Sequence, residues 1–259
     1  MSEIRIGTLC SGSKGNSTLV AYKDTAVLID AGRSTKYLRD ALASINMTPD
    51  QINAVFLTHS HADHTSALKV WTSRYSTPVH ATAPVCSAVL SRCGEGVLVS
   101  HPIVFECAIG DIIVKSFPTD HDSLGSVGYC FSFVGDERRV GIATDLGSVT
   151  EQVSNGLCGC VAAVIESNHN VEMLLNGPYP PDLKQRILSR FGHLSNESGA
   201  ELAEYLANNG AKALLLAHLS EINNTPELAH RASSELLSKF GDSVSLEIAH
   251  PAHPVIITL

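Results

Sequence analysis

Four residues of metal-ligating type stand close together in the motif Thr58-His59-Ser60-His61-Ala62-Asp63-His64. The apolar stretch 54–57 directly before the motif is typical of a buried strand. In an extended chain His59 and His61 lie two positions apart and therefore point to the same side. The aspartate and histidine that end the motif come where the chain is expected to turn into a helix, and they point in another direction. Ligands in two directions favour a pair of adjacent metal ions over a single ion.

Three further residues of ligand type follow apolar stretches that are typical of core strands. They are His121 after 112–117, Asp145 after 140–143 and His218 after 213–217. A single histidine at a strand end is more often an ordinary surface residue, but the repetition of this pattern after the motif favours metal ligation. No cysteine stands among these positions, so the donor atoms are all nitrogen and oxygen. Such a set accepts zinc, manganese or iron.

Composition narrows the class of protein that carries these residues. The 259 residues include 18 Lys plus Arg and 26 Asp plus Glu, a formal net charge of −8, which argues against a broad basic surface for nucleic acid. A nucleic-acid end drawn into a pocket is still compatible, because two divalent ions add about +4 there. The apolar stretch 157–165 is far shorter than the roughly 18 residues that span a bilayer. With no signal-peptide pattern at the N-terminus and seven irregularly spaced cysteines, we expect a cytoplasmic protein that is not inserted in a membrane.

The elements that position these residues form two blocks of strands, each followed by helices. We expect strands at 4–9, 18–22, 26–30 and 54–57, further strands between 105 and 142, and strands at 213–217 and 244–249. We expect a helix capped by Ser34, and helices at 180–191, 197–208 and 226–240, the last capped by Thr225. No linker or repeat divides residues 1–259, so we predict a single domain. Two such blocks indicate the α/β class and a four-layer αββα sandwich, with the sheets face to face and the helices outside.

This combination resembles the metallo-β-lactamase fold superfamily, through the histidine motif, Asp30 before it, and the three strand-end residues after it. Over nearly the whole chain it resembles one branch, the YycJ/WalJ/VicX-like metallo-hydrolases. The segments that carry this second resemblance are Ser11–Ser17, Glu166–His169, Gly177–Pro180, Gly192–Asn196 and Leu216–Ser220. The resemblance implies two divalent metal ions, with zinc the first choice and manganese or iron the alternatives. One ion would be held by His59, His61 and His121, the other by Asp63, His64 and His218, with Asp145 bridging the two.

The resemblance also implies roles for residues around the metals. Asp63, Asp30 and His193 belong to the catalytic machinery, in which Asp30 would orient the metal-binding loop. An ordinary turn aspartate is the alternative for Asp30. His193 is similar to a histidine that faces the leaving group or the scissile phosphate in phosphodiesterase branches, although a surface histidine before a helix is the alternative. Candidate contacts to substrate are Ser13 and Asn16 in a Gly/Ser loop that otherwise forms a plain turn, and Asn168 and His169.

The leading hypothesis is a dinuclear metal-dependent phosphodiesterase, similar to a DNA exonuclease, in which a hydroxide bridging the metals attacks phosphorus. The negative charge, and the absence of a long insertion between His121 and His218, favour short, single-stranded or terminal DNA over a long gripped duplex. Two alternatives stay open: a carbonyl hydrolase of the same fold, acting on β-lactams or thioesters, and a metal-binding regulatory protein without catalysis.

Overall fold

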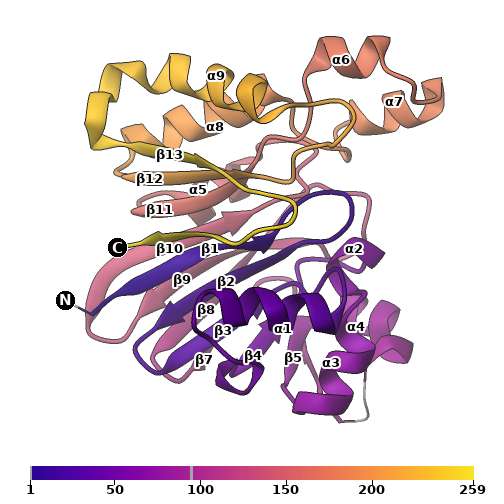
Figure 1. Cartoon of the computed structure of the whole chain (residues 1–259), viewed down its shortest axis with the longest axis vertical. Coiled ribbons are helices and arrows are strands. Elements are labelled where there is room, and N and C mark those ends of the chain that lie inside the picture. Colours follow the sequence, from indigo (N-terminus) through magenta and orange to yellow (C-terminus); the bar gives the residue numbers. More distant parts are fainter. Residues whose placement is uncertain (1, 94–95) are drawn as a thin grey trace.

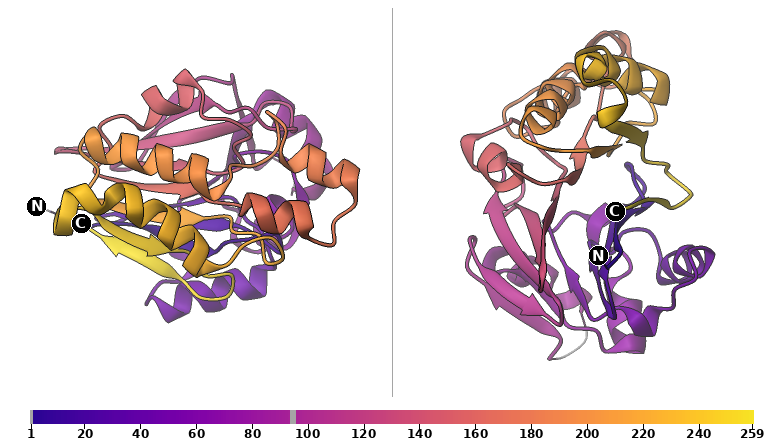
Figure 2. Two further views of the ribbon diagram at one scale, coloured as in Figure 1. Left: turned by 90° about the horizontal axis from the view of Figure 1, so that it is seen from above. Right: turned by 90° about the vertical axis from the view of Figure 1, so that its left-hand side faces the viewer.

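Two seven-stranded sheets face each other in the computed structural model, which describes residues 2–93 and 96–259. Helices cover the outer face of each sheet, and the layers are seen edge-on in the right-hand view of Figure 2. The strand order is β14-β1-β2-β3-β4-β5-β6 in the first sheet and β13-β12-β11-β10-β9-β8-β7 in the second (Figure 1). The fold is therefore the predicted αββα sandwich.

The first sheet contains β1 (Ile4–Cys10), β2 (Ser17–Tyr22), β3 (Thr25–Ile29), β4 (Ala54–Phe56), β5 (Val79–Thr82), β6 (Leu98–His101) and β14 (Val255–Thr258). The second contains β7 (Glu106–Ile109), β8 (Ile112–Pro118), β9 (Val127–Phe133), β10 (Asp136–Ala143), β11 (Ala162–Glu166), β12 (Ala213–Ala217) and β13 (Ser245–Ile248). In each sheet one half is antiparallel and the other half, β3 to β6 or β10 to β13, is parallel. The parallel halves bring the carboxyl ends of their strands to a common edge.

The helices are α1 (Thr35–Ser44), α2 (Ala62–Thr65), α3 (Leu68–Tyr75), α4 (Ala83–Val89), α5 (Glu151–Leu157), α6 (Val171–Asn176), α7 (Pro181–Ile187), α8 (Asn196–Asn208) and α9 (Pro226–Leu237). Short 3₁₀ turns occupy Pro49–Gln51, Leu90–Arg92 and Ser238–Ser243. Helices α1, α3 and α4 lie on the first sheet, α5, α8 and α9 lie on the second, and α6 and α7 extend from one end (Figure 1). Among the described residues, no helix has the length and apolar character needed to cross a membrane.

Three apolar cores hold the layers together. The central core lies between the sheets and contains aromatic side chains of both, including Phe56, Tyr129 and Phe131. The other two cores lie between each sheet and its helices, and the fully buried Trp71 belongs to the one under α3. Because both faces of each sheet are covered, strands such as β12 are apolar at every position instead of alternating.

The caps proposed for two helices are confirmed. The Ser34 hydroxyl accepts a hydrogen bond from the Tyr37 amide at 3.2 Å, and the Thr225 hydroxyl accepts one from the Leu228 amide at 3.3 Å. The helix expected over 180–191 is too long, since α7 ends at Ile187. It ends there because the chain turns back and the His193 amide donates to the Ile187 carbonyl at 3.0 Å. The sequence patterns also predict none of the elements between residues 66 and 101, nor β14.

Candidate metal centre

The candidate ligands gather at the edge where the parallel strands of both sheets end. Asp30 follows β3, the histidine motif follows β4, Asp145 follows β10 and His218 follows β12. Loops beyond the carboxyl ends of parallel strands are the usual ligand-binding position in α/β sheets. Three of these residues have positive φ angles, 64° at Asp30, 59° at Asp145 and 59° at His218. Left-handed backbone is uncommon outside glycine and clusters at functional sites, so the sharp turns aim these side chains at one point.

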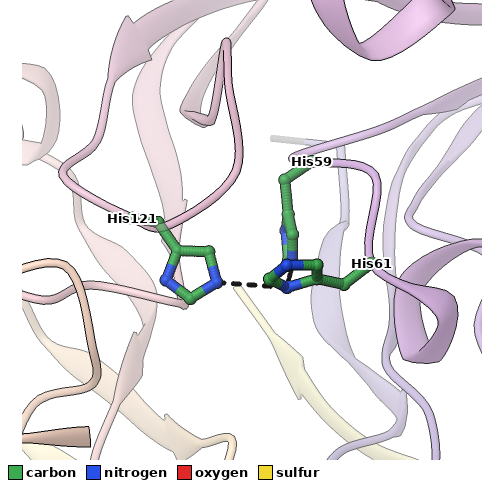
Figure 3. Close-up of side chains that lie close together, drawn as sticks. All are labelled: His59, His61 and His121. Carbon is green, nitrogen blue, oxygen red and sulfur yellow. Dashed lines mark hydrogen bonds between the residues drawn. The ribbon is translucent and has the colours of Figure 1, made fainter. Parts of the chain in front are cut away.

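Three histidines form the first group of donors. His59 Nε2 lies 3.1 Å from His61 Nδ1, which in turn lies 3.3 Å from His121 Nε2 (Figure 3). His59 and His121 are buried, whereas His61 is partly exposed. Nitrogen atoms at this spacing surround a position for one cation with three protein ligands.

The second group combines one carboxylate with two histidines. Asp63 Oδ2 lies 3.3 Å from His64 Nε2 and 3.7 Å from His218 Nε2. His64 and His218 are almost fully buried. The group therefore offers a second cation three ligands from two separate segments, two from the histidine motif and one from the end of β12.

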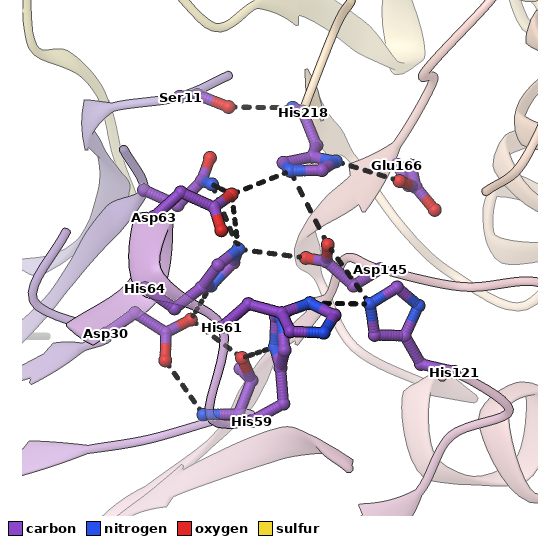
Figure 4. Close-up of polar contacts among 12 residues, drawn as sticks. Ser11, Asp30, His59, His61, Asp63, His64, His121, Asp145, Glu166 and His218 are labelled. Atoms are coloured by element: carbon purple, nitrogen blue, oxygen red, sulfur yellow. Dashed lines mark hydrogen bonds and ion pairs between the residues drawn. The ribbon is translucent and has the colours of Figure 1, made fainter. Parts of the chain in front are cut away.

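The Asp145 carboxylate lies between the two groups. Its Oδ2 is 3.4 Å from His64 Nε2, and its Oδ1 is 3.5 Å from His218 Nε2 and 3.8 Å from His121 Nε2 (Figure 4). One carboxylate thus faces ligands of both groups. This is the position that a bridging residue requires.

Two buried ligand-type atoms that lack hydrogen-bond partners among the described residues indicate that the donor set fits metal ions. Asp145 Oδ2 and His218 Nε2 are buried and have no hydrogen-bond partner within the described part of the chain. Leaving a buried polar atom unsatisfied normally costs about 1–3 kcal/mol. A cation between these atoms would satisfy both, so the residues present suit the divalent ions that the fold family implies.

For four of the candidate histidines, an oxygen acceptor beside Nδ1 leaves Nε2 as the nitrogen that faces the centre. Nδ1 of His59 lies 2.9 Å from the Thr58 hydroxyl, and Nδ1 of His121 lies 3.2 Å from the Gly192 carbonyl. For His64 and His218 the acceptors are the carboxylates of Asp30, at 2.7 Å, and Glu166, at 3.0 Å. A proton held at Nδ1 leaves Nε2 free to accept a cation, which is the usual arrangement of metal-binding histidines.

Asp30 is hydrogen-bonded to the histidine motif from beneath. One carboxylate oxygen accepts from the Thr58 amide at 2.8 Å, and the other accepts from the Thr58 hydroxyl and His64 Nδ1. With 3% of its surface exposed, Asp30 lies beneath the motif and away from the cavity. Asp30 is therefore not isolated in its turn, because its carboxylate contacts the backbone and two side chains of the motif.

The Gly/Ser loop and the turn after β3 hold the motif from the other side. The Asn16 amide donates to the Asp63 carbonyl at 2.8 Å, and the Asn16 side-chain nitrogen lies 3.1 Å from Asp63 Oδ2 and 3.0 Å from His64 Nε2. Gly32 packs so closely here that a Cβ atom would lie 1.9 Å from the Asp63 carbonyl oxygen. Asn16 therefore supports two candidate ligands instead of lining the cavity.

The pKa values of the candidate histidine ligands are shifted in opposite directions: burial lowers some, and neighbouring carboxylates raise others. Burial, together with the neighbouring His64, lowers the pKa of His59 well below its usual value, and burial lowers that of His121. Burial opposes the charge of His218, but the carboxylates of Asp145, Asp63 and Glu166 together outweigh burial and raise the pKa of His218 to about 10. Without cations, protons on His64 and His218 offset the buried carboxylates, and cation binding releases such protons.

His193 and Glu166 stand beside the metal ligands. His193 Nδ1 donates to Glu166 Oε1 at 2.8 Å, and the His193 ring centre lies 5.1 Å from that of His218 and 5.3 Å from that of His121. Glu166 is fully buried and also accepts from the Leu146 and Leu194 amides. The other face of His193 lines the cavity, so it is not the exposed surface residue of the alternative interpretation.

A cavity of about 230 Å³ opens over the centre. Of the four predicted substrate residues, Ser13 and Asn168 line it, whereas Asn16 and His169 do not. His169 is 2% exposed, and its backbone is paired with that of Ser195. Another part of the cavity wall comes from α7 and the segment before it, including Tyr179 and Arg186. Arg186 forms an ion pair with Asp122.

Sequence reasoning missed three residues of this site. Glu166 ends an apolar strand in the same way as Asp145 and His218, so the strand-end pattern predicts it if applied consistently. Asp122, whose Oδ1 is 3.3 Å from His121 Nε2, directly follows a predicted ligand. For Arg186, a basic residue on the helix expected over 180–191, the sequence favours a solvated face over a contact to a substrate backbone, so its place in the cavity wall is not predicted.

Comparison with known proteins identifies the family. Residues 11–90 match the metallo-beta-lactamase superfamily. The chain is 37% identical over 237 residues, 89% of this chain and 87% of the relative, to exodeoxyribonuclease WalJ of Streptococcus pneumoniae. It is 33% identical over 261 residues, 98% of this chain and 97% of the relative, to exodeoxyribonuclease YycJ of Bacillus anthracis. The chain belongs to the WalJ/YycJ family of the metallo-β-lactamase superfamily.

Solved structures agree with the WalJ/YycJ assignment at the level of the fold. The metallo-beta-lactamase fold protein YhfI from Bacillus subtilis superimposes with a TM-score of 0.75 over the whole of both chains, at 14% identity. Human tRNase Z, short form, superimposes with a TM-score of 0.67 over 98% of each chain, at 15% identity. Membership of this family makes the chain a metal-dependent hydrolase.

Proposed function

We propose that this chain is a dinuclear metal-dependent phosphodiesterase that removes nucleotides from DNA ends. The observation that carries the proposal is the Asp145 carboxylate between two three-ligand groups, beside a histidine held by a buried glutamate. The relatives named exodeoxyribonucleases, which align over most of the chain, support DNA as the substrate class.

Seven residues of the chain are proposed to hold the two cations. They are His59, His61 and His121 at one position, Asp63, His64 and His218 at the other, and Asp145 at both. Bound divalent cations supply a water acidic enough to attack near neutral pH and neutralise charge on the phosphodiester. Nitrogen and oxygen donors accept zinc first, and also manganese or iron.

The remaining residues orient the substrate and move a proton. Glu166 accepts a hydrogen bond from His193 Nδ1, so a doubly protonated His193 ring would carry its second proton on Nε2 and could give that proton to the leaving oxygen in the cavity. Ser13 and Asn168 line the cavity and offer hydrogen bonds to phosphate oxygens, and Arg186 offers a charge to the next phosphate.

The size of the cavity favours an end of a strand. Its volume of about 230 Å³ is below the roughly 300–1,000 Å³ of pockets that hold drug-sized ligands, so it admits one phosphodiester and little more. A net charge of −8 argues against a broad basic surface that grips a duplex. Both features support short, single-stranded or terminal DNA.

Metal-reconstituted protein, assayed on several substrate classes side by side, tests this function. The panel contains bis-p-nitrophenyl phosphate, single- and double-stranded oligonucleotides, a thioester and a β-lactam, each with zinc or manganese and each repeated after chelation. We expect hydrolysis of the phosphodiesters and loss of that activity on chelation. Hydrolysis of the thioester or the β-lactam alone would favour the carbonyl hydrolase instead. Metal binding with no hydrolysis of any substrate would favour the regulatory protein.

A further inference from the structure

A second group of metal-ligating side chains lies away from the centre, where the edges of the two sheets meet. His80 is on β5, His101 ends β6 and Cys107 is on β7. Strand β6 is the edge of the first sheet in the order of strands, and β7 is the edge of the second. His101 pairs with Thr82, two positions after His80, so the two histidine side chains project from the same face of the first sheet.

The three donor atoms already lie close to the spacing of a metal site. His80 Nδ1 is 3.0 Å from His101 Nε2. A nitrogen of His80, a nitrogen of His101 and the Cys107 sulfur all lie within 4.8 Å of one another. Tetrahedral zinc with its usual bond lengths needs ligand atoms about 3.3 Å apart for two nitrogens and about 3.6 Å apart for nitrogen and sulfur. The nitrogen pair at 3.0 Å is about 0.3 Å short of the first value, and the sulfur, within 4.8 Å of the other donors, is at most about 1.2 Å beyond the second.

Aromatic packing holds both imidazole rings in place. The His101 ring lies on Phe105 with centres 4.0 Å apart and planes 11° apart, and the His80 ring lies on Phe56 with centres 4.7 Å apart. The two imidazole planes are 17° apart. Rings fixed in this way lose little freedom when they bind a cation, which favours binding.

Both histidines are suited to accept a cation at neutral pH. Burial and the adjacent His101 lower the pKa of His80 to about 4, and burial lowers the pKa of His101. Neutral rings have no proton to lose when a cation binds. Cys107 is half-buried, so a water molecule can reach a fourth position beside it.

The geometry points to a mononuclear site for a soft divalent cation, zinc above all, at His80, His101 and Cys107. Imidazole with thiolate is a donor set that zinc prefers, in contrast to the all nitrogen and oxygen set of the candidate metal centre. A cation there ties the edge of the second sheet to the edge of the first. A buried hydrogen bond between two neutral histidines, with Cys107 as an unrelated neighbour, is the competing interpretation.

Cobalt titration of the metal-stripped full-length protein distinguishes the two interpretations. Cobalt bound to a thiolate gives a charge-transfer band in the near ultraviolet, which nitrogen and oxygen ligands do not give. We expect this band in the wild type and in Cys93→Ser, which removes another half-buried cysteine, and its loss in Cys107→Ser. Elemental analysis after zinc loading should give one zinc fewer in Cys107→Ser than in Cys93→Ser.

A second variant keeps the proposal testable if Cys107→Ser does not fold. His101→Gln retains the thiol but removes a ligand, and it should weaken cobalt binding at this site by more than the roughly 10–100-fold that loss of an outer partner costs. The band should persist in Asp145→Asn, so failure of this site and failure of the proposed function are separable. An unchanged band and zinc count in Cys107→Ser, unchanged affinity in His101→Gln, or no band in the wild type would overturn the proposal.

Discussion

Asp145 is the residue whose replacement tests the two-metal arrangement most directly, because its carboxylate faces both ligand groups. We expect Asp145→Ala to abolish turnover and to lower the metal content toward one ion or fewer per chain. The positive φ of 59° adds a backbone cost for alanine, of about 1–2 kcal/mol. Asp145→Asn is the matched control, since asparagine tolerates this backbone and removes only the charge. Two tightly held metals in both variants, measured by elemental analysis, would refute the bridging role.

The contribution of His193 is separable from that of the ligands, because its side chain is held by Glu166 and lies beside the donor groups. We expect His193→Ala to retain two metals and to lose about 10²–10⁴-fold in kcat, or roughly 3–5 kcal/mol. The loss should be largest for esters with an alkoxide leaving group and much smaller for a nitrophenyl ester, whose leaving group departs without a proton. A uniform loss across leaving groups would indicate substrate positioning instead of proton donation.

Glu166, at the end of β11, links two elements by accepting hydrogen bonds from His193 and from His218 at the end of β12. We expect Glu166→Gln to cost about 10–100-fold in activity or metal affinity, because it perturbs a metal ligand and the proton donor together. The double variant with His193→Ala separates these effects. In the double variant, metal affinity should fall as far as in Glu166→Gln alone. The kcat of the double variant should be only slightly lower than that of His193→Ala alone. Fully additive losses in kcat would show that Glu166 does not act through His193.

We predict that Gly32, in the turn after β3, allows the histidine motif to pack closely against this turn. In Gly32→Ala the new methyl group would overlap the Asp63 carbonyl and the Asn16 amide, and we expect a loss of about 1–3 kcal/mol together with weaker metal binding. Thermal unfolding with and without zinc measures both effects. Gly135→Asn, in the open turn between β9 and β10, is the control and should change stability by less than about 0.5 kcal/mol. Equal behaviour of the two variants would contradict the close fit.

At the scale of the whole molecule, the confined cavity and the negative charge predict a preference for DNA ends. We expect linear single-stranded DNA to be degraded and a covalently closed circle of the same sequence to resist. Nicking the circle should restore degradation, because it creates an end without changing composition. Gel analysis of matched linear, closed and nicked substrates measures this, and equal rates on all three would rule out the preference.

Much of the candidate centre can be predicted from the sequence, because several of its residues lie close together along the chain. His59, His61, Asp63 and His64 belong to one short segment, whose direction is fixed by the strand before it and the helical turn within it. Apolar stretches locate Asp145 and His218, since the covered second half of β10 and the whole of β12 are apolar, and a residue of ligand type follows close after each. The caps at Ser34 and Thr225 are also predicted correctly, because each hydroxyl bonds an amide only three residues further along the chain.

Only the tertiary structure decides which distant side chains meet. Arg186 reaches Asp122 across 64 positions because the turn after α7 brings that helix over the cavity, and no local pattern records this. His80, His101 and Cys107 meet because the two sheets meet at β6 and β7, so their proximity depends on how the sheets pack. Sequence spacing fixes where a side chain leaves its own element. Strand order and the packing of two sheets across their shared core fix what that side chain faces.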